Sequence, residues 1–158
     1  MKNKISNIII IILSVIIILY IGLFIFGYRI YAVKTASMHP DIYQGSIVIA
    51  KKLNSDEVFD EISLGSDIVF RTSSNTTVTH RVIMLDEAND KLQTQGIREG
   101  SSKDAVISSS NVLGKVSFSI PLIGYVVMLI QSQYFIYLAL CCIAIYVVST
   151  LLIKQLKK

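Results

Sequence analysis

Two long apolar runs constrain the fold of this chain more than any other feature of its sequence. Residues 8–27 contain no charged side chain, and residues 134–153 form a second uncharged run of the same length. About twenty apolar residues in a helix are enough to cross the ~30 Å hydrocarbon core of a bilayer. We therefore expect two transmembrane helices that flank a single domain, residues 28–133.

The first run is also too long for a typical cleavable export signal. Such a signal has an apolar core of ~7–15 residues followed by a small-x-small cleavage site. The end of the run, from Phe24 to Arg29, contains no such site. The sequence therefore favours a permanent membrane anchor over an export signal.

The position of the charges predicts the topology of the two helices. The formal net charge of +4 comes from five lysines at the two tips, whereas residues 28–133 hold ten basic and eleven acidic side chains. Basic residues next to membrane spans tend to stay in the cytoplasm. We expect tips 1–7 and 154–158 on the cytoplasmic side of the cell membrane and the domain of residues 28–133 outside it, with the lipid bilayer as a partner.

The same distribution argues against several other classes of function. A nucleic-acid-binding domain would carry its excess positive charge on the folded domain, so no nucleic-acid partner is expected. The two cysteines, Cys141 and Cys142, lie inside the second apolar run and cannot cross-link the domain. With two histidines, no cysteine outside the run and no Gly-rich phosphate loop, we expect neither a metal nor a cofactor.

The domain between the runs has the pattern of a mainly β fold. Its β-branched and aromatic segments are short and are bounded by Gly, Ser, Asn and Asp, as strands usually are. The predicted strands are residues 46–50, 67–71, 77–83 and 113–118, with a turn at 73–76 and a further strand pair within 85–93. Residues 58–64 are ambiguous, because the polar residues 54–57 before them could cap a helical turn. Residues 119–132 are apolar and are expected to lie in the membrane interface.

Ser37 is the first candidate for a catalytic group. It begins the segment Ser37–Pro40, in which the fixed φ of proline forces a turn. A serine at the start of such a turn can present its hydroxyl group outward while its own N–H faces a developing oxyanion. The local pattern alone nevertheless favours an ordinary loop serine.

A nucleophilic serine needs a base, and two histidines are available. The ring of His39, two residues after Ser37, would have to fold back across the turn. His80 lies in the alternating segment 77–83 and shares its face with two valines. Such a histidine is either a satisfied core residue or a partly buried base, and the local sequence does not separate these alternatives.

The third group of a serine-histidine site is a carboxylate that orients the imidazole. Asp104 lies in a polar segment just before an apolar pair and is one candidate. Asp67, Asp86 and Glu99 are its competitors.

The order of these segments resembles that of type I signal peptidases. His80 stands where most bacterial members have lysine, which resembles the endoplasmic-reticulum-type enzymes and the SipW-like bacterial members. A second C-terminal span also occurs among the SipW-like enzymes. The likeness covers residues 35–125 in five ordered blocks: the serine box at 37–40, a strand at 65–70, the base segment at 79–82, the acidic box at 94–104 and the exit from the domain at 113–124.

The resemblance implies both a fold and an activity. The fold is a signal-peptidase-like β catalytic domain outside the cell membrane, flanked by two transmembrane α-helices. The activity is that of a serine endopeptidase that removes N-terminal signal peptides from exported preproteins after small-x-small sites. Ser37 would be the nucleophile, His80 the general base and Asp104 the orienting carboxylate.

The substrate is expected to add as a strand to a free edge of the sheet near Asp67–Arg71. Its small side chains would enter pockets on that strand and beside the serine. The predicted substrate-binding residues are Met38, Asp67, Ile68, Val69 and Phe70.

Three departures from the family pattern bear on the site. Ile97 stands where the acidic box often begins with aspartate, and the stretch to Asp104 is one residue longer than usual. Asp41 replaces a common threonine, and an acid so close to the nucleophile would favour a protonated His80.

Two rival hypotheses remain open from the sequence. One is a catalytically inactive membrane chaperone for pilus or surface-protein assembly, which would hold an extended segment on the same sheet. The other keeps catalysis but uses a serine-lysine dyad with Lys51, Lys52 or Lys91. The sequence also leaves open whether an accessory subunit takes part.

Overall fold

The computed structural model describes residues 2–156. Met1 of the predicted tip 1–7, and Lys157 and Lys158 of the predicted tip 154–158, lie outside the described residues.

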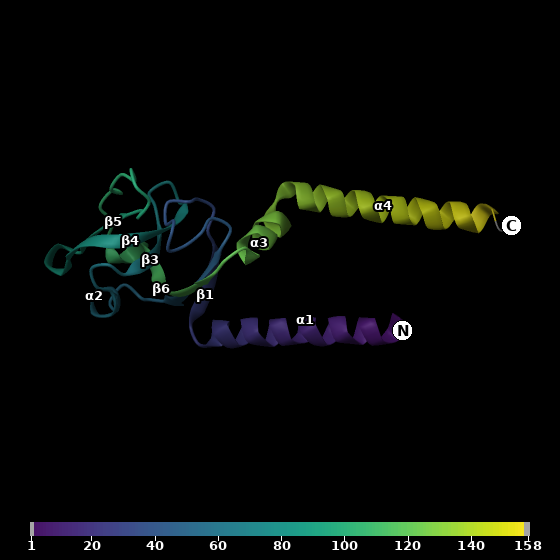
Figure 1. The fold of residues 1–158 in the computed structure, drawn as a ribbon, viewed down its shortest axis with the longest axis horizontal. Coiled ribbons are helices and arrows are strands. Elements are labelled where there is room, and N and C mark those ends of the chain that lie inside the picture. The colour runs from purple at the N-terminus through teal and green to yellow at the C-terminus, as the bar shows by residue number, and fades with distance from the viewer. Residues whose placement is uncertain (1, 157–158) are drawn as a thin grey trace.

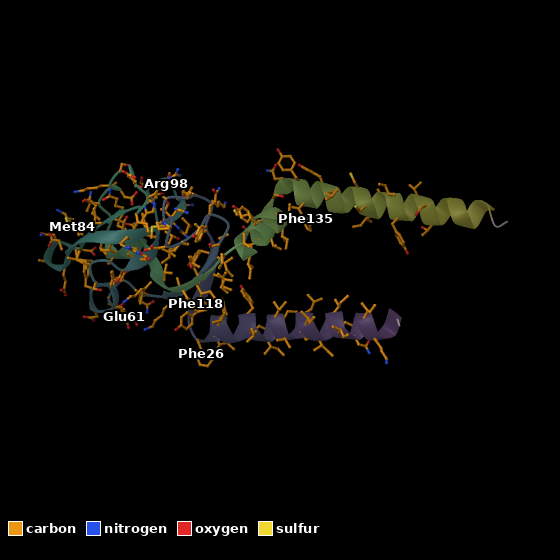
Figure 2. All side chains as sticks on the ribbon, viewed as in Figure 1. Phe26, Glu61, Met84, Arg98, Phe118 and Phe135 are labelled. Carbon is orange, nitrogen blue, oxygen red and sulfur yellow. The ribbon has the colours of Figure 1, made fainter. Side chains whose placement is uncertain are left out.

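Two long helices, α1 (Lys2–Ile25) and α4 (Gln133–Leu156), extend in the same direction from one end of a β domain (Figure 1). Their apolar side chains point outward from the ribbon, as Figure 2 shows, and Ile18 and Ile145 are 67% and 69% exposed. By length and composition, both helices can span a membrane. The first ends two residues before the predicted limit, because Gly27 adopts a positive φ of 80° and turns the chain into the domain.

The domain is built on one antiparallel sheet, which confirms the prediction of a mainly β fold. The sheet has six strands in the order β1-β2-β6-β3-β4-β5. Its strands are β1 (Tyr28–Ala32), β2 (Ile47–Lys52), β3 (Asp67–Arg71), β4 (Thr77–Asp86), β5 (Lys91–Gln95) and β6 (Val112–Ile120). Short helices connect them: α2 (Val58–Glu61), η1 (Glu87–Asn89), η2 (Ser109–Asn111) and, before α4, α3 (Ile123–Gln131).

Most predicted elements are present. The four predicted strands correspond to β2, β3, β4 and β6, and the predicted further pair is formed by the end of β4 and by β5. The turn at 73–76 joins β3 to β4, with Asn75 at a φ of 62°. The ambiguous segment forms the single turn α2, which begins after Glu57 without a side-chain cap.

Strand β1 is missing from the predicted elements. Its residues follow the apolar run directly, so the sequence pattern does not separate them from the helix. In the structure they pair with β2, from Tyr28 opposite Lys51 to Ala32 opposite Ile47. Helix α1 is thus joined to an edge of the sheet by a turn at Gly27 rather than by a linker.

Apolar side chains cover both faces of the central strand β3. Ile68 and Phe70 belong to one buried cluster, whereas Val69 belongs to a second. This division follows from the alternation of side chains along a strand. The second cluster also contains Met38 and Ile42, so the core holds the segment that carries Ser37.

Helix α3 packs against β1. Gly124 is buried there, and a Cβ atom at its position would collide with the backbone carbonyl oxygens of Gly45 and Ser46. Residues 119–132 therefore comprise the end of β6 and a helix docked on the domain. Their placement in a membrane interface stays a prediction.

Candidate active site

Ser37 lies in a loop, residues 33–46, that we call the serine loop. The loop is closed at its base by hydrogen bonds from the Val33 N–H to the Ser46 carbonyl, at 2.8 Å, and from the Gly45 N–H to the Val33 carbonyl, at 2.9 Å. Met38, with no exposed surface, and Ile42, 4% exposed, anchor the loop in the core. These contacts therefore fix the chain both before and after Ser37.

A second segment also fixes the backbone at Ser37. The Arg98 N–H donates to the Ser37 carbonyl oxygen at 2.9 Å. Gly96 lies so close that a Cβ atom at its position would be 2.8 Å from that oxygen and 3.0 Å from the Ser37 Cβ. The absence of a side chain at Gly96 lets the predicted acidic box approach the serine.

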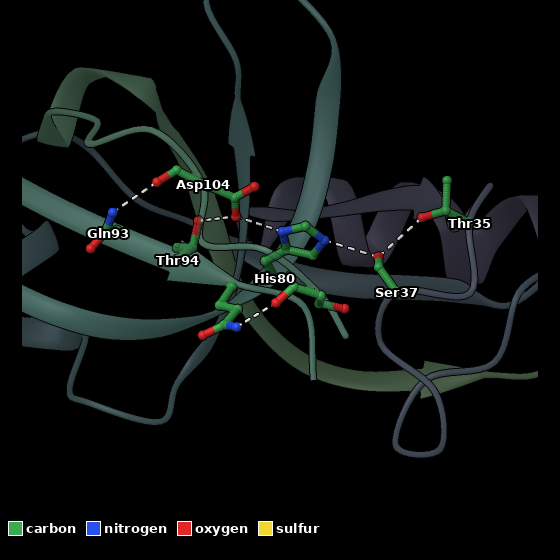
Figure 3. A network of polar contacts seen from close by, with 8 residues as sticks. Thr35, Ser37, His80, Gln93, Thr94 and Asp104 are labelled. Carbon is green, nitrogen blue, oxygen red and sulfur yellow. Dashed lines mark hydrogen bonds and ion pairs between the residues drawn. The ribbon is translucent and has the colours of Figure 1, made fainter. Parts of the chain in front are cut away.

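His80 projects from β4 toward Ser37, and its Nε2 atom lies 2.9 Å from the Ser37 Oγ (Figure 3). Its Nδ1 atom lies 2.6 Å from Asp104 Oδ2. The side chains of His80 and Asp104 are 12% and 26% exposed, so the histidine is partly shielded from water. Serine hydroxyl, imidazole and carboxylate thus form one continuous row of hydrogen bonds.

The edge strand β5 holds Asp104 in place. The Thr94 Oγ1 donates to Asp104 Oδ2 at 2.7 Å, and the Asp104 N–H donates to the Thr94 carbonyl at 2.8 Å. The Gln93 side-chain amide donates to the Asp104 carbonyl at 2.9 Å. The long stretch before Asp104 therefore does not displace its carboxylate from the imidazole.

Thr35 and Thr94 are two members of the network that the sequence analysis missed. Thr35 Oγ1 lies 3.1 Å from Ser37 Oγ, and either hydroxyl can donate (Figure 3). Thr94 shares the Asp104 carboxylate oxygen with His80. Threonine is a common residue, so its type alone carried no signal. The register of β5 beside β4 shows the role of Thr94.

Four of the competing acids and bases are engaged elsewhere. Asp67 binds Arg81, and Asp86 accepts hydrogen bonds from Asn89 at the start of η1. The ring of His39 packs edge-on against Tyr43, with centroids 5.0 Å apart. Lys51 donates to Glu61 at 2.8 Å.

Asp41, the acid that was expected to act on His80, faces a different partner. Its Oδ2 atom lies 2.8 Å from the Nη2 atom of Arg81. The hydrogen bonds that Arg81 donates to Asp67 and then to Asp41 raise the pKa of Arg81 further above its already high value. Ile97, at the position of the missing aspartate, packs against the core cluster that contains Met38.

The prediction that substrate pairs along Asp67–Arg71 is also wrong. Strand β3 is hydrogen-bonded to β4 on one side and to β6 on the other, so it has no free edge. Met38, Ile68 and Val69 have no exposed surface and Phe70 is 1% exposed, so these side chains support the site from within the core. Asp67 is bound to Arg81.

Free edges lie elsewhere, on either side of a cavity of about 530 Å³ that we call the edge groove. One wall is formed by residues 30–35 and the other by residues 75–79, with Gln131 from α3 also lining it. In the described sheet β1 pairs only with β2, and β4 pairs with β5 only from Arg81 onward. Unpaired backbone groups of both strands can therefore face this cavity.

The groove leads to the hydrogen-bonded row. Thr35 lies at the end of one wall and contacts the Ser37 hydroxyl, and Thr79 at the end of the other wall immediately precedes His80. Burial raises the pKa of the Tyr31 phenol in the first wall, against the opposing effect of Arg29 and then Arg71. Within residues 2–156, no cluster of three or more His, Cys, Asp or Glu side chains is arranged to hold a metal ion.

Comparison with known proteins agrees with this arrangement. Residues 4–89 match the family described as "Signal peptidase, peptidase S26", which is just over half of the chain. Over 100 residues the chain is 30% identical to Signal peptidase I W of Bacillus subtilis (strain 168). That alignment covers 61% of this chain and 51% of the relative, so the chain spans about half the length of the curated relative it matches.

The family match contains Ser37 and His80, whereas Asp104 lies beyond it and is connected to the site by the fold alone. The chain belongs to the peptidase S26 family of signal peptidases, and its likeness to Signal peptidase I W places it with the type I, SipW-like members.

Proposed function

We propose that this chain is a membrane-bound serine endopeptidase that removes N-terminal signal peptides from exported preproteins after small-x-small sites. Ser37 acts as the nucleophile, His80 as the general base and Asp104 as the orienting carboxylate. The observation that carries the proposal is the row of hydrogen bonds from Ser37 Oγ through both ring nitrogens of His80 to Asp104 Oδ2.

The row has the chemistry that acyl transfer needs. His80 Nε2 accepts the Ser37 proton as Oγ attacks the scissile carbonyl carbon, and the resulting imidazolium donates its proton to the leaving amine as the C–N bond breaks. Water then attacks the acyl-enzyme, with His80 taking a proton from the water and returning one to Ser37. Asp104 holds the ring in the required orientation and stabilises its charged form.

The backbone at Ser37 supports the same reaction. Within the part of the chain that the structure describes, the Ser37 N–H donates to no protein acceptor. It can therefore donate to the oxyanion that forms on the scissile carbonyl oxygen. The Ser37 carbonyl is bound by the Arg98 N–H, which limits rotation of the peptide group on the other side.

The edge groove is the proposed substrate site. An extended peptide between the two walls, residues 30–35 and residues 75–79, can form main-chain hydrogen bonds to the unpaired backbone groups of both strands. The peptide then reaches Ser37 and His80 at the end of the groove. Alternate side chains of such a strand point to the same face of the sheet, so a limit on their size at two alternate positions is the expected specificity.

The membrane places the enzyme beside its substrate. We propose that α1 and α4 span the cell membrane, that residues 1–7 and 154–158 are cytoplasmic and that residues 28–133 form the extracytoplasmic domain. Both helices leave the domain in the same direction (Figure 1) and expose apolar side chains (Figure 2). Confinement of enzyme and signal peptide to one bilayer raises their effective concentration. The topology is tested by protease protection: in intact cells, added protease should reach the β domain while tags at both ends stay protected.

The activity is tested with the full chain in lipid vesicles, with a preprotein that carries an Ala-x-Ala site as substrate. The wild type should release the mature protein, and Ser37→Ala should reduce cleavage to background. An inactive chaperone predicts instead that the wild type binds the preprotein without cleaving it, and that Ser37→Ala leaves this binding unchanged. Cleavage that survives in Ser37→Ala would exclude the proposed nucleophile.

A further inference from the structure

Arg81 makes a two-sided contact that the proposed reaction does not use. Its Nε and Nη2 atoms lie 2.8 Å and 3.0 Å from the two carboxylate oxygens of Asp67. The same Nη2 atom lies 2.8 Å from Asp41 Oδ2. Asp67 stands directly opposite Arg81 in the β3–β4 register, so the paired bond fixes the plane of the guanidinium group.

The contact with Asp41 joins two parts of the site. Asp41 belongs to the serine loop, four residues after Ser37, whereas Arg81 follows His80 in β4. Successive side chains of a strand point to opposite faces. Ser37 therefore contacts β4 through His80 on one face, and Asp41 contacts it through Arg81 on the other.

We infer that Arg81 is a positioning residue: by binding Asp41, it holds the serine loop in the orientation that keeps the Ser37 hydroxyl against His80. This inference rests on the proposed function of Ser37 and His80. Backbone hydrogen bonds hold the loop at its base and at the Ser37 carbonyl, and the bond to Asp41 adds a directional contact with β4 in the part of the loop that follows Ser37. Met38 and Ile42 fix the depth of the loop, but apolar burial is non-directional and does not set its rotation.

The exposure of the three side chains predicts an effect on rate rather than on stability. Asp67 is 19% exposed, Arg81 32% and Asp41 47%. A contact as exposed as that of Asp41 contributes little to the free energy of folding. A small displacement of a nucleophile, in contrast, can cost about 10²-fold in rate.

The test uses Asp41→Asn in the full chain, in lipid vesicles, with cleavage of the same preprotein. The substitution keeps the size of the side chain and removes its charge. We expect kcat to fall about 10-fold with KM within about twofold, and the midpoint of thermal unfolding to fall by less than about 4 °C. Arg81→Lys, which keeps the charge but loses the planar fork, should also lower kcat.

A double variant separates the positioning role from independent effects. If Arg81 acts on the serine through Asp41, then Asp41→Asn should lower kcat much less in the Arg81→Lys background than in the wild type. The matched control is Glu61→Gln, which removes a contact of the same 2.8 Å length between exposed side chains and should leave kcat unchanged.

The outcomes separate this inference from the proposed function. If Ser37→Ala is inactive but Asp41→Asn cleaves with the wild-type kcat, the positioning role is wrong and the proposed function stands. If Asp41→Asn loses kcat only in proportion to the fraction unfolded, the contact is merely structural and the inference is also wrong. If Ser37→Ala cleaves like the wild type, the proposed function fails, and the positioning role fails with it.

Discussion

The row Ser37–His80–Asp104 and the pair Lys51–Glu61 are polar contacts of similar length in very different surroundings. The histidine and Asp104 are 12% and 26% exposed, whereas Lys51 and Glu61 are 47% and 42% exposed. Each member of the row is also held by further hydrogen bonds or by the core, but the pair joins two long side chains in solvent. The supporting contacts, more than the length of a polar contact, decide what its loss will cost.

The largest expected effect in this comparison is the loss of the base. His80→Ala should lower kcat by about 10³-fold or more, because the Ser37 hydroxyl then has no group to accept its proton. The measurement is preprotein cleavage by the full chain in vesicles, with thermal unfolding as the control for folding. Near-normal turnover would show that a lysine, such as Lys51, Lys52 or Lys91, supplies the base.

Asp104→Asn tests the other end of the row. The substitution keeps the size of the side chain but removes the charge that stabilises the imidazolium, so kcat should fall by about 10²-fold or more. Thr94→Val, which removes only the hydroxyl that also contacts Asp104, should have a smaller effect, about 10-fold. Equal turnover by Asp104→Asn and the wild type would mean that the contact orients the ring without contributing to the reaction.

Substitutions at two glycines compare steric crowding at the candidate site with steric crowding elsewhere in the domain. Gly96→Ala would push against the backbone and Cβ of Ser37, and Gly114→Ala would push against the backbone of Lys51 and Lys52. Both should destabilise the domain by about 1–3 kcal/mol. Only Gly96→Ala should also lower the kcat of the folded fraction, by about 10-fold, because it displaces the nucleophile. A similar loss of kcat in Gly114→Ala would contradict this distinction.

The smallest effect should come from Glu61→Gln. The hydrogen bond to Lys51 lowers the pKa of the Glu61 carboxyl and raises the pKa of Lys51. A lowered carboxyl pKa stabilises the folded state above the unfolded pKa, and this contribution is lost as the pH falls through the folded pKa. A raised lysine pKa stabilises the folded state below the unfolded pKa. This contribution is lost as the pH rises through the folded pKa.

The thermal midpoints of Glu61→Gln and the wild type should therefore differ slightly near neutral pH and converge in strong acid and strong alkali. Thermal unfolding followed by circular dichroism across this pH range is the measurement. Curves that diverge in acid would mean that the pair does not act through these two titrations.

Much of the fold could be predicted because its signals are local. The apolar runs, the alternation along residues 77–83 and the turn at 73–76 each depend on neighbours in the chain, and they correspond to α1, α4, β4 and the β3–β4 turn. Strand β1 was missed because it continues an apolar run, and only its pairing with β2 distinguishes it.

The candidate site also has features that could be predicted from the sequence and features that could not. Ser37, His80 and Asp104 could be named from residue type and order, but 43 residues separate the first two and 24 the last two. We expected the substrate edge along Asp67–Arg71, a segment whose centre is apolar and β-branched. In the folded chain those very properties place β3 at the centre of the sheet, with a hydrogen-bonded strand on each side.

The sequence by itself determined which segments are apolar enough for a membrane, where five of the six strands lie and which residue types could perform acyl transfer. These properties follow from side-chain chemistry and short-range periodicity. Only the tertiary structure decided that Asp104 reaches His80, that Asp41 binds Arg81, and that the free edges lie at β1 and at the start of β4. These outcomes depend on strand order and register, which arise from packing between residues far apart in the chain.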